Sequence, residues 1–142
     1  MNSAIVAAGL AAAAVAAASV IQRRRPDAPT QGSNYSAPTQ IDRADFLRPD
    51  IDQIVVVFSS STCDVCASVV DVAMQFASRN VAVHNVEYSL DEALHVRYNI
   101  DAVPTVVVAD HHGRVTAAFT GQVSYASLRD SLGWATAPPP ES

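Results

Sequence analysis

Residues 59–66 read Ser-Ser-Ser-Thr-Cys-Asp-Val-Cys and contain both cysteines of the chain. They follow a run of β-formers at 54–58 and lead into a segment with helical apolar spacing. A strand that runs into a helix with Cys-x-x-Cys on its first turn is typical of a redox site. Residues i and i+3 of such a turn have Cα atoms roughly 5 to 6 Å apart, which suits a disulfide without backbone movement. We therefore expect Cys63 and Cys66 to form a disulfide that opens and closes on a fixed scaffold.

The two sulfurs are expected to differ in role. Cys63 is the more N-terminal thiol, and the free N–H groups and dipole of a helix start favour its ionised form. A thiolate is the nucleophile in disulfide exchange, so we predict that Cys63 attacks the substrate. Cys66, one turn further on and on the apolar face, is predicted to resolve the mixed disulfide.

Other uses of the cysteine pair stay open from the residues alone. A structural zinc site needs four ligands, and the remaining candidates are His84, His95 and the adjacent His111–His112, whose spacing does not fit. Copper delivery would need further Cys, Met or His ligands beside the pair, where the chain has Ser, Thr and Asp. Two core cysteines without chemistry are another alternative. The redox interpretation is preferred, and it needs no metal and no organic cofactor.

Composition excludes one class of partner. The chain has 142 residues, which predicts a single domain with segments left over at its ends. The net charge is −5 and the pI is about 5.1, so no basic face is available to neutralise phosphates. We therefore expect no nucleic-acid partner.

The segment 4–21 contains no charged residue and consists mainly of Ala, Val, Leu and Ile. As a helix it would span about 27 Å, close to the hydrocarbon thickness of a bilayer. Arg23, Arg24 and Arg25 follow it, and arginine clusters prefer the cytoplasmic side. We expect residues 1–22 to be a single-pass anchor in the cell membrane, with the rest of the chain in the cytoplasm. An exported domain and a helix outside the membrane are the alternatives.

After the anchor, the pattern predicts a linker, one compact domain and a tail. Residues 23–40 are expected to be a flexible linker, and residues 134–142 a disordered, proline-rich tail. Residues 41–133 form the domain, in which a strand-helix-strand unit predicts a parallel crossover. The expected elements are a short helix at 43–47 capped by Asp42, strands at 53–58, 81–87, 105–109 and 114–119, and helices at 63–79, 90–98 and 124–132.

Two further patterns predict local structure. Pro104 stands at the start of an expected strand, which favours a cis peptide bond between Val103 and Pro104. The run Asp-His-His-Gly at 110–113 has the composition of a hairpin turn, so His111–His112 are expected to be turn residues. His95 is predicted to be a surface or helix-packing histidine.

Taken in order, these features resemble thioredoxin. They are the strand before the Cys63–Cys66 pair, the Val-Pro-Thr at 103–105, the β-hairpin, Gly121 and the last helix. The match covers residues 41–133, which is essentially the whole predicted domain. The resemblance implies a thioredoxin-like α/β fold, with a central mixed sheet of four or five strands flanked by helices.

The resemblance also implies a substrate groove. In thioredoxin the cis-proline packs across from the first cysteine and lines a groove where an extended substrate chain pairs with the backbone. Pro104 takes that position here, opposite Cys63, and Val103 and Thr105 lie on either side of it. Thr62, next to Cys63, is the remaining groove candidate.

Several positions depart from the thioredoxin pattern. Thr62 replaces the tryptophan before the first cysteine, and Asp64–Val65 replace the Gly-Pro between the cysteines. Val57 stands in place of the buried aspartate, and Asn85 in place of the associated lysine. In the family that aspartate accepts the proton of the resolving thiol. Cys66 must therefore lose its proton to water or to another group.

Two carboxylates near the pair are of interest for this reason. Glu87, at the end of its strand, is a candidate proton acceptor for Cys66. Asp64 lies next to Cys63, where a negative charge would raise the pKa of the thiol. It can equally serve the helix start, where an acidic residue is favourable.

The expected function is a membrane-anchored thiol-disulfide oxidoreductase, most simply a cytoplasmic reductase. Its partners would be a protein disulfide substrate, a redox donor that recycles the pair, and the membrane through residues 4–21. On the exported side the same residues would serve disulfide oxidation, isomerisation or cytochrome assembly. The alternative from another class is a non-catalytic binding module, which keeps the fold and the groove but not the chemistry.

Overall fold

The computed structural model describes residues 36–134. Its elements in chain order are the 3-10 helix η1 (Arg43–Asp45), β1 (Gln53–Ser59), α2 (Cys66–Met74), β2 (Val81–Glu87), α3 (Glu92–Arg97), β3 (Thr105–Asp110), β4 (Val115–Thr120) and α4 (Tyr125–Ser131). The predicted anchor, the linker up to residue 35 and the tail beyond residue 134 lie outside the described residues. Among the residues that are described, no helix is long and apolar enough to cross a membrane.

The strands form one mixed sheet in the order β2-β1-β3-β4. β1 and β2 are parallel, while β3 is antiparallel to both β1 and β4. This four-stranded sheet with flanking helices confirms the predicted fold class. Phe58 near the end of β1 pairs with Thr105 at the start of β3. The turn after β1, which carries the cysteines, therefore lies at the same end of the sheet as the loop before β3.

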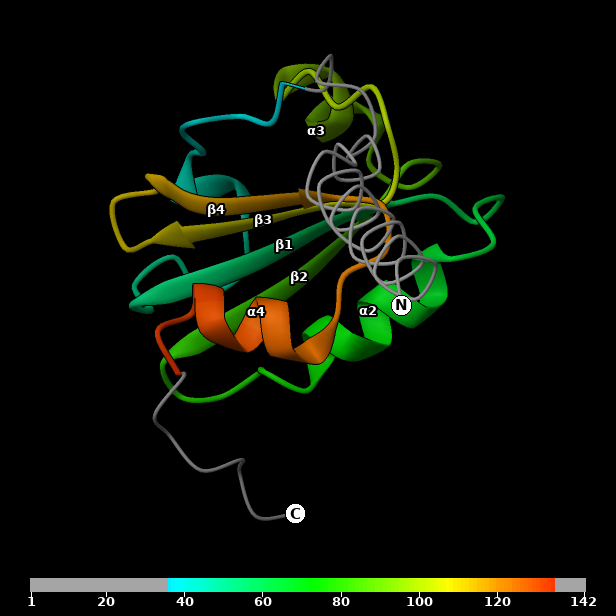
Figure 1. The fold of residues 1–142 in the computed structure, drawn as a ribbon. Coiled ribbons are helices and arrows are strands. Elements are labelled where there is room, and N and C mark those ends of the chain that lie inside the picture. The colour runs from blue at the N-terminus through cyan, green and yellow to red at the C-terminus, as the bar shows by residue number, and fades with distance from the viewer. Residues whose placement is uncertain (1–35, 135–142) are drawn as a thin grey trace, which may run out of the picture. The chain divides into compact units, whose positions relative to one another are not determined.

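Helices cover both faces of the sheet (Figure 1). α2 and α4 lie on one face, where Val55 and Val57 of β1 contribute to the core. α3 lies on the other face, where Ile54, Val56 and Phe58 belong to a second core cluster. All five of these side chains are fully buried, and each such burial contributes about 1.5 to 3 kcal/mol. β1 is thus anchored from both sides, which fixes the position of the turn that follows it.

The helix predicted over 63–79 is observed as Cys66–Met74. Beyond Met74 the chain turns toward β2, because Ser78 and Val81 bind each other. The Ser78 N–H donates to the Val81 carbonyl at 3.0 Å, and the Ser78 hydroxyl accepts the Val81 N–H at 3.2 Å. This turn ends the helical path before residue 79.

The helix predicted over 90–98 is also shorter, at Glu92–Arg97. The N–H groups of Leu90 and Asp91 both donate to the carbonyl of Glu87, at 3.1 and 2.9 Å, and form a turn in place of a first helical turn. The other strands and helices agree with the prediction to within two residues. The predicted cap of the first helix is confirmed, since Asp42 accepts the Ala44 N–H at 2.9 Å.

Candidate active site

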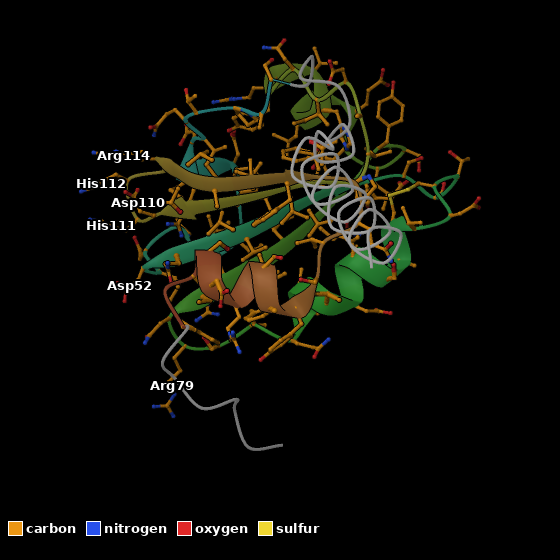
Figure 2. The ribbon with its side chains drawn as sticks, in the orientation of Figure 1. Asp52, Arg79, Asp110, His111, His112 and Arg114 are labelled. Carbon is orange, nitrogen blue, oxygen red and sulfur yellow. A yellow bond between two sulfur atoms is a disulfide. The ribbon has the colours of Figure 1, made fainter. Side chains whose placement is uncertain are left out.

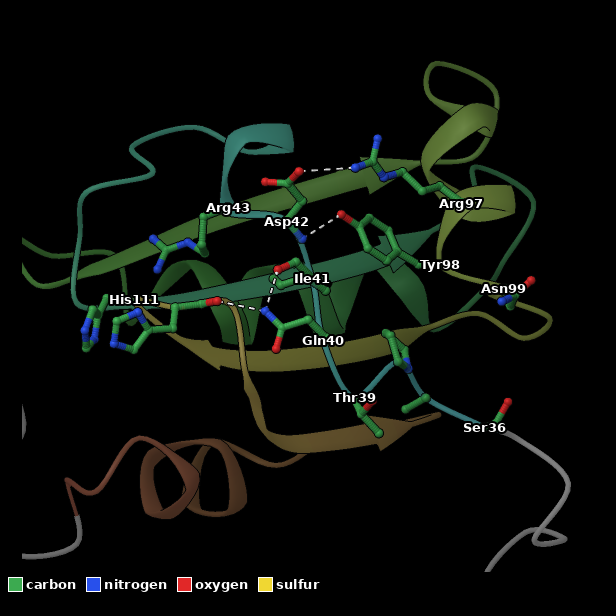
Figure 3. A pocket seen from close by; sticks show the side chains of 13 residues that line it. Ser36, Thr39, Gln40, Ile41, Asp42, Arg43, Arg97, Tyr98, Asn99 and His111 are labelled. Atoms are coloured by element: carbon green, nitrogen blue, oxygen red, sulfur yellow. Dashed lines mark hydrogen bonds and ion pairs between the residues drawn. The ribbon is translucent and has the colours of Figure 1, made fainter.

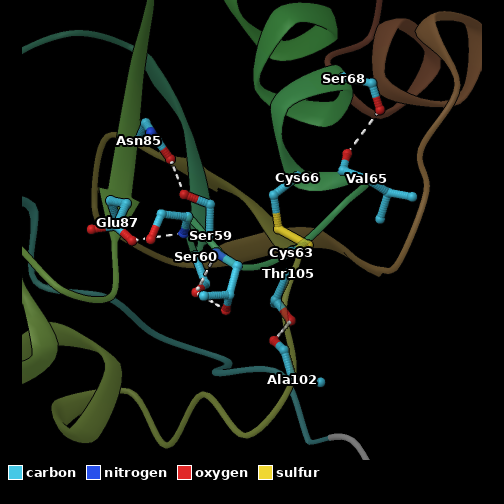
Figure 4. The surroundings of a disulfide bond; sticks show 12 residues. Ser59, Ser60, Cys63, Val65, Cys66, Ser68, Asn85, Glu87, Ala102 and Thr105 are labelled. Atoms are coloured by element: carbon cyan, nitrogen blue, oxygen red, sulfur yellow. Dashed lines mark hydrogen bonds between the residues drawn. A yellow bond between two sulfur atoms is a disulfide. The ribbon is translucent and has the colours of Figure 1, made fainter.

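Cys63 and Cys66 form a disulfide across the turn between β1 and α2 (Figure 4). Their Cα atoms are 5.5 Å apart, within the range expected from the sequence. Cys66 is only 3% exposed, whereas Cys63 is half-buried. A substrate can therefore reach the Cys63 sulfur more easily, and this difference favours Cys63 as the attacking sulfur.

α2 begins at Cys66, so the prediction that Cys63 lies on the first helical turn was wrong. Val65 is the N-cap, and the Val69 N–H donates to the Val65 carbonyl at 3.3 Å. Cys63 opens a tight turn instead, in which its carbonyl accepts the Cys66 N–H at 3.4 Å. Its sulfur is bonded to that of Cys66, the first helical residue, so after reduction a Cys63 thiolate would lie near the helix N-terminus, where the dipole favours negative charge.

The predicted groove residues lie at this same end of the sheet. The Val103–Pro104 peptide bond is cis, as predicted. The Pro104 carbonyl accepts the Gly121 N–H at 2.8 Å, and the Thr105 hydroxyl donates to the Ala102 carbonyl at 2.8 Å (Figure 4). These two bonds hold the loop before β3 in place.

The groove candidates differ in how accessible they are. Pro104 and Thr105 are buried, and Val103 is half-buried. Thr62 is exposed on the turn before Cys63, and its Oγ1 lies 3.0 Å from the hydroxyl oxygen of Ser60. Val103 and Thr62 are thus the groove candidates whose side chains a ligand can contact most readily.

A pocket of about 320 Å³ adjoins both cysteines, between α2 and the ends of β1 and β2. On its β1 and β2 side, the Ser59 hydroxyl donates to Oδ1 of Asn85 at 2.6 Å (Figure 4). Glu87 and Asp71 add two carboxylates to its lining. Val57, two residues before Ser59, is fully buried in the apolar core and offers no proton acceptor.

Sequence reasoning missed two residues of this pocket. Ser59 reads only as the residue after the strand predicted at 53–58, and Asp71 as one more polar position on a helix. Neither belongs to a recognisable motif. Only the packing of α2 against β2 brings Asp71 into the same pocket as Asn85 and Glu87.

Glu87 is held by four hydrogen bonds. One carboxylate oxygen, Oε1, accepts the Ser61 N–H at 2.8 Å. The other, Oε2, accepts the N–H and hydroxyl of Ser89 and the Leu90 N–H. The Ser89 hydroxyl and the Ser61 N–H lower the pKa of Glu87. Glu87 therefore fastens the cysteine turn to the turn after β2, and its lowered pKa makes it a weak proton acceptor for Cys66.

The histidines have structural positions. His95 is 2% exposed, with Nε2 2.9 Å from the Val86 carbonyl oxygen and its ring edge-on to Phe58, which confirms the helix-packing prediction. His111–His112 occupy the turn between β3 and β4, also as predicted. Within residues 36–134, no three His, Cys, Asp or Glu side chains are grouped so that they could hold a metal ion.

A larger pocket, of about 710 Å³, lies away from the cysteines (Figure 3). It is lined by the segment 36–43, the end of α3 and the β3–β4 turn. Of its charged groups, Arg97 binds Asp42 at 3.3 Å and also Asp45, outside the lining, at 3.0 Å. Arg43 donates to the carbonyls of Asp110 and Arg48, and its buried Nε has no partner among the described residues. It contains no cysteine, so we assign the candidate chemistry to the smaller pocket.

Comparison with solved structures identifies the fold of this chain. A variant thioredoxin from Halobacterium salinarum matches with a TM-score of 0.57 and 21% identity, covering 74% of this chain and 99% of that one. Thioredoxin-2 of the malaria parasite, described as a component of the protein secretion machinery, matches with a TM-score of 0.52 and 18% identity, covering 58% of this chain and 82% of that one. The chain has the thioredoxin fold.

A third solved structure, Trxlp from Edwardsiella tarda, agrees, with a TM-score of 0.51 and 18% identity over 64% of this chain and 93% of that one. No family model matches the sequence, and no curated protein matches it significantly. The similarity therefore lies in the three-dimensional structure.

Proposed function

We propose that this chain is a thiol-disulfide oxidoreductase that reduces disulfides in protein substrates. The observation that carries the proposal is the disulfide between a half-buried Cys63 and a buried Cys66, at a helix start beside the loop that holds Pro104. A reversible redox pair needs one sulfur that a substrate can reach and a second, less accessible sulfur that resolves the mixed disulfide. This turn provides both.

In the reduced protein, the Cys63 thiolate attacks one sulfur of the substrate disulfide. A mixed disulfide forms, and the other substrate sulfur leaves as a thiolate that takes up a proton. Cys66 then loses its proton and attacks Cys63, which closes the Cys63–Cys66 disulfide and releases the second substrate sulfur. Two electrons pass to the substrate, so a dithiol donor must reduce the pair before the next cycle.

The proton of Cys66 needs an acceptor in this scheme. Val57 supplies none, and Glu87 is a poor one because its pKa is lowered by its hydrogen bonds. The pocket beside Cys66 has room for roughly ten waters, at about 30 Å³ each. We assign the role of acceptor to water in this pocket.

Substrate binding is assigned to the groove beside the pair. Val103, Pro104 and Thr105 would present backbone to an extended substrate segment, and Thr62 would contact it on the other side of Cys63. Val103 and Thr62 are the accessible members. The exposed Val65, between the two cysteines, adds an apolar contact at the same place.

We further propose that the domain is attached to the cell membrane through residues 4–21 and faces the cytoplasm, where the pair would act as a reductase. The support is the uncharged segment followed by Arg23, Arg24 and Arg25. Membrane fractionation, and protease treatment of intact cells and of inverted vesicles, test this directly. A domain cleaved from the outside of intact cells would contradict it.

The test of the activity is reduction of insulin disulfides by the full chain with dithiothreitol as donor. We expect turnover that disappears in the Cys63→Ser variant. Incubated with insulin in the absence of dithiothreitol, the reduced Cys66→Ser variant should accumulate the mixed disulfide with substrate, visible as a mass increase that dithiothreitol then reverses. The absence of turnover in the unmodified protein would favour a binding module, an alternative that rests on Thr62, Val57 and Asn85 standing where thioredoxin has its tryptophan, aspartate and lysine.

A further inference from the structure

The charged side chains that line the pocket beside the disulfide are all negative. Among the described residues, the charged ones that line it are Asp71 and Glu87, both acidic, and no arginine of this part of the chain belongs to the lining. The pocket adjoins Cys63, so a group bound there would lie next to the sulfur that attacks the substrate. This combination of reactive sulfur, defined volume and negative charge is not found in the larger pocket.

Both carboxylates have room for a further hydrogen bond. The Asp71 side chain is exposed and accepts no hydrogen bond or ion pair from any residue in 36–134. Glu87 uses Oε2 for three bonds but Oε1 for only one, the Ser61 N–H. A carboxylate has about four acceptor positions, so Oε1 can take a second donor. The lowered pKa of Glu87 keeps it ionised near neutral pH.

The six arginines of residues 36–134 all lie or bind elsewhere. Arg43 donates to the carbonyls of Asp110 and Arg48, and Arg48 donates to those of Ser78 and Arg79. Arg79 and Arg114 lie at the end of the sheet opposite the cysteine turn, together with Asp52 (Figure 2). Arg97 binds Asp42 and Asp45, and Arg129 binds Asp130. The negative charge of the pocket is therefore not neutralised from within the described part of the chain.

Further acidic groups surround this end of the molecule. Asp64 lies between the cysteines, and Asp91 and Glu92 follow the turn that Glu87 fastens to the cysteine turn. A field of one sign around a reactive site raises the encounter rate of partners with the opposite charge. A cationic substrate segment is thus favoured both on approach and in the pocket.

We propose that the pocket lined by Asp71 and Glu87 is a subsite for a cationic side chain, lysine or arginine, close to the reactive disulfide of the protein substrate. This inference rests on the proposed oxidoreductase function and narrows its substrate class. At about 320 Å³ the pocket is near the lower limit of small-molecule sites. It suits one long side chain, whose stem can lie against Ala67 and Val70 while its head reaches the two carboxylates.

The test compares two disulfide peptides that differ only beside the cysteine, one with lysine and one with glutamate. The full chain should reduce the lysine peptide with the higher kcat/KM at low salt. We expect the Asp71→Asn variant to lower kcat/KM for the lysine peptide by roughly two- to fivefold, the upper range for an exposed ion pair. Asp71→Arg should reverse the preference between the peptides. Salt should reduce the preference, because the carboxylates are open to solvent.

Asp52→Asn is the matched control. It removes the same charge from an exposed residue at the opposite end of the sheet (Figure 2), and it should leave the preference unchanged. Equal reduction of the two peptides, or equal effects of Asp71→Asn and Asp52→Asn, would overturn the subsite and leave the oxidoreductase function standing. No reduction of either peptide would instead overturn the oxidoreductase function and the subsite with it.

Discussion

The two pockets of this domain differ most in whether they adjoin a cysteine. The larger one, about 710 Å³, is lined by Arg97 and Asp42, which bind each other. The smaller one, about 320 Å³, adjoins two cysteines and the carboxylate of Asp71, whose side chain has no hydrogen-bond or ion-pair partner within residues 36–134. The difference teaches that volume does not locate the chemistry of a fold. The two cysteines of the smaller pocket locate it.

The largest effect should come from the smaller pocket. We expect Cys63→Ser to abolish insulin reduction, because the reaction loses its nucleophile. The fold should be kept, because the only bond removed from the structure is the Cys63–Cys66 disulfide. Far-ultraviolet circular dichroism checks the fold of the variant. Residual turnover above the uncatalysed rate would mean that Cys66 can attack substrate itself, against its 3% exposure.

The core beneath the end of β1 gives the second prediction. Val57 is fully buried in the apolar core between β1 and α2. Val57→Asp should lower the free energy of unfolding by about 3 to 5 kcal/mol at pH 7, the cost of an uncompensated buried charge. Urea unfolding measures it, with the near-isosteric Val57→Thr as the milder control. A well-tolerated aspartate would show that water reaches this part of the core.

Glu87 gives a prediction with a defined pH dependence. Hydrogen bonds from the Ser89 hydroxyl and the Ser61 N–H lower its folded-state pKa. Ionised Glu87 therefore stabilises the fold above its unfolded pKa of about 4.3, and this contribution is lost as the pH falls through the lower folded value. Glu87→Gln should lower Tm at pH 7, and the difference from the unmodified protein should shrink in strongly acidic solution. A Tm difference independent of pH would contradict an electrostatic role.

The smallest effect should come from the larger pocket. Arg97→Ala removes two ion pairs, but the Arg97 side chain is 52% exposed. Exposed pairs of this kind contribute about 0.2 to 1 kcal/mol each, so urea unfolding should detect only a small loss. Insulin reduction should be unchanged. A loss of turnover in Arg97→Ala would contradict the assignment of the redox chemistry to the smaller pocket.

The sheet and the cysteine turn could be predicted because their signals are local. Five consecutive apolar residues at 54–58 predict a strand buried on both faces, and that strand is the centre of both core clusters. The Cys63–Cys66 spacing predicts a disulfide, which the structure contains. The proline at 104 predicts the cis bond that is observed.

The remaining features depend on contacts that the sequence does not display. α2 ends at Met74 because of the bonds between Ser78 and Val81, and α3 begins late because of the bonds to the Glu87 carbonyl. Such bonds override an apolar period that would continue each helix. Asp71 enters the site only because α2 packs against β2, and no spacing in the sequence indicates that.

The most direct test of the central claim is the reduction potential of the Cys63–Cys66 pair in the full chain, measured by equilibration in glutathione or dithiothreitol buffers. A protein-disulfide reductase should give a value of about −270 mV, in the range of thioredoxin. A value of about −180 mV or higher would contradict the reductase and indicate an oxidant or isomerase. A value below about −300 mV, typical of structural disulfides, would contradict a redox role for the pair altogether.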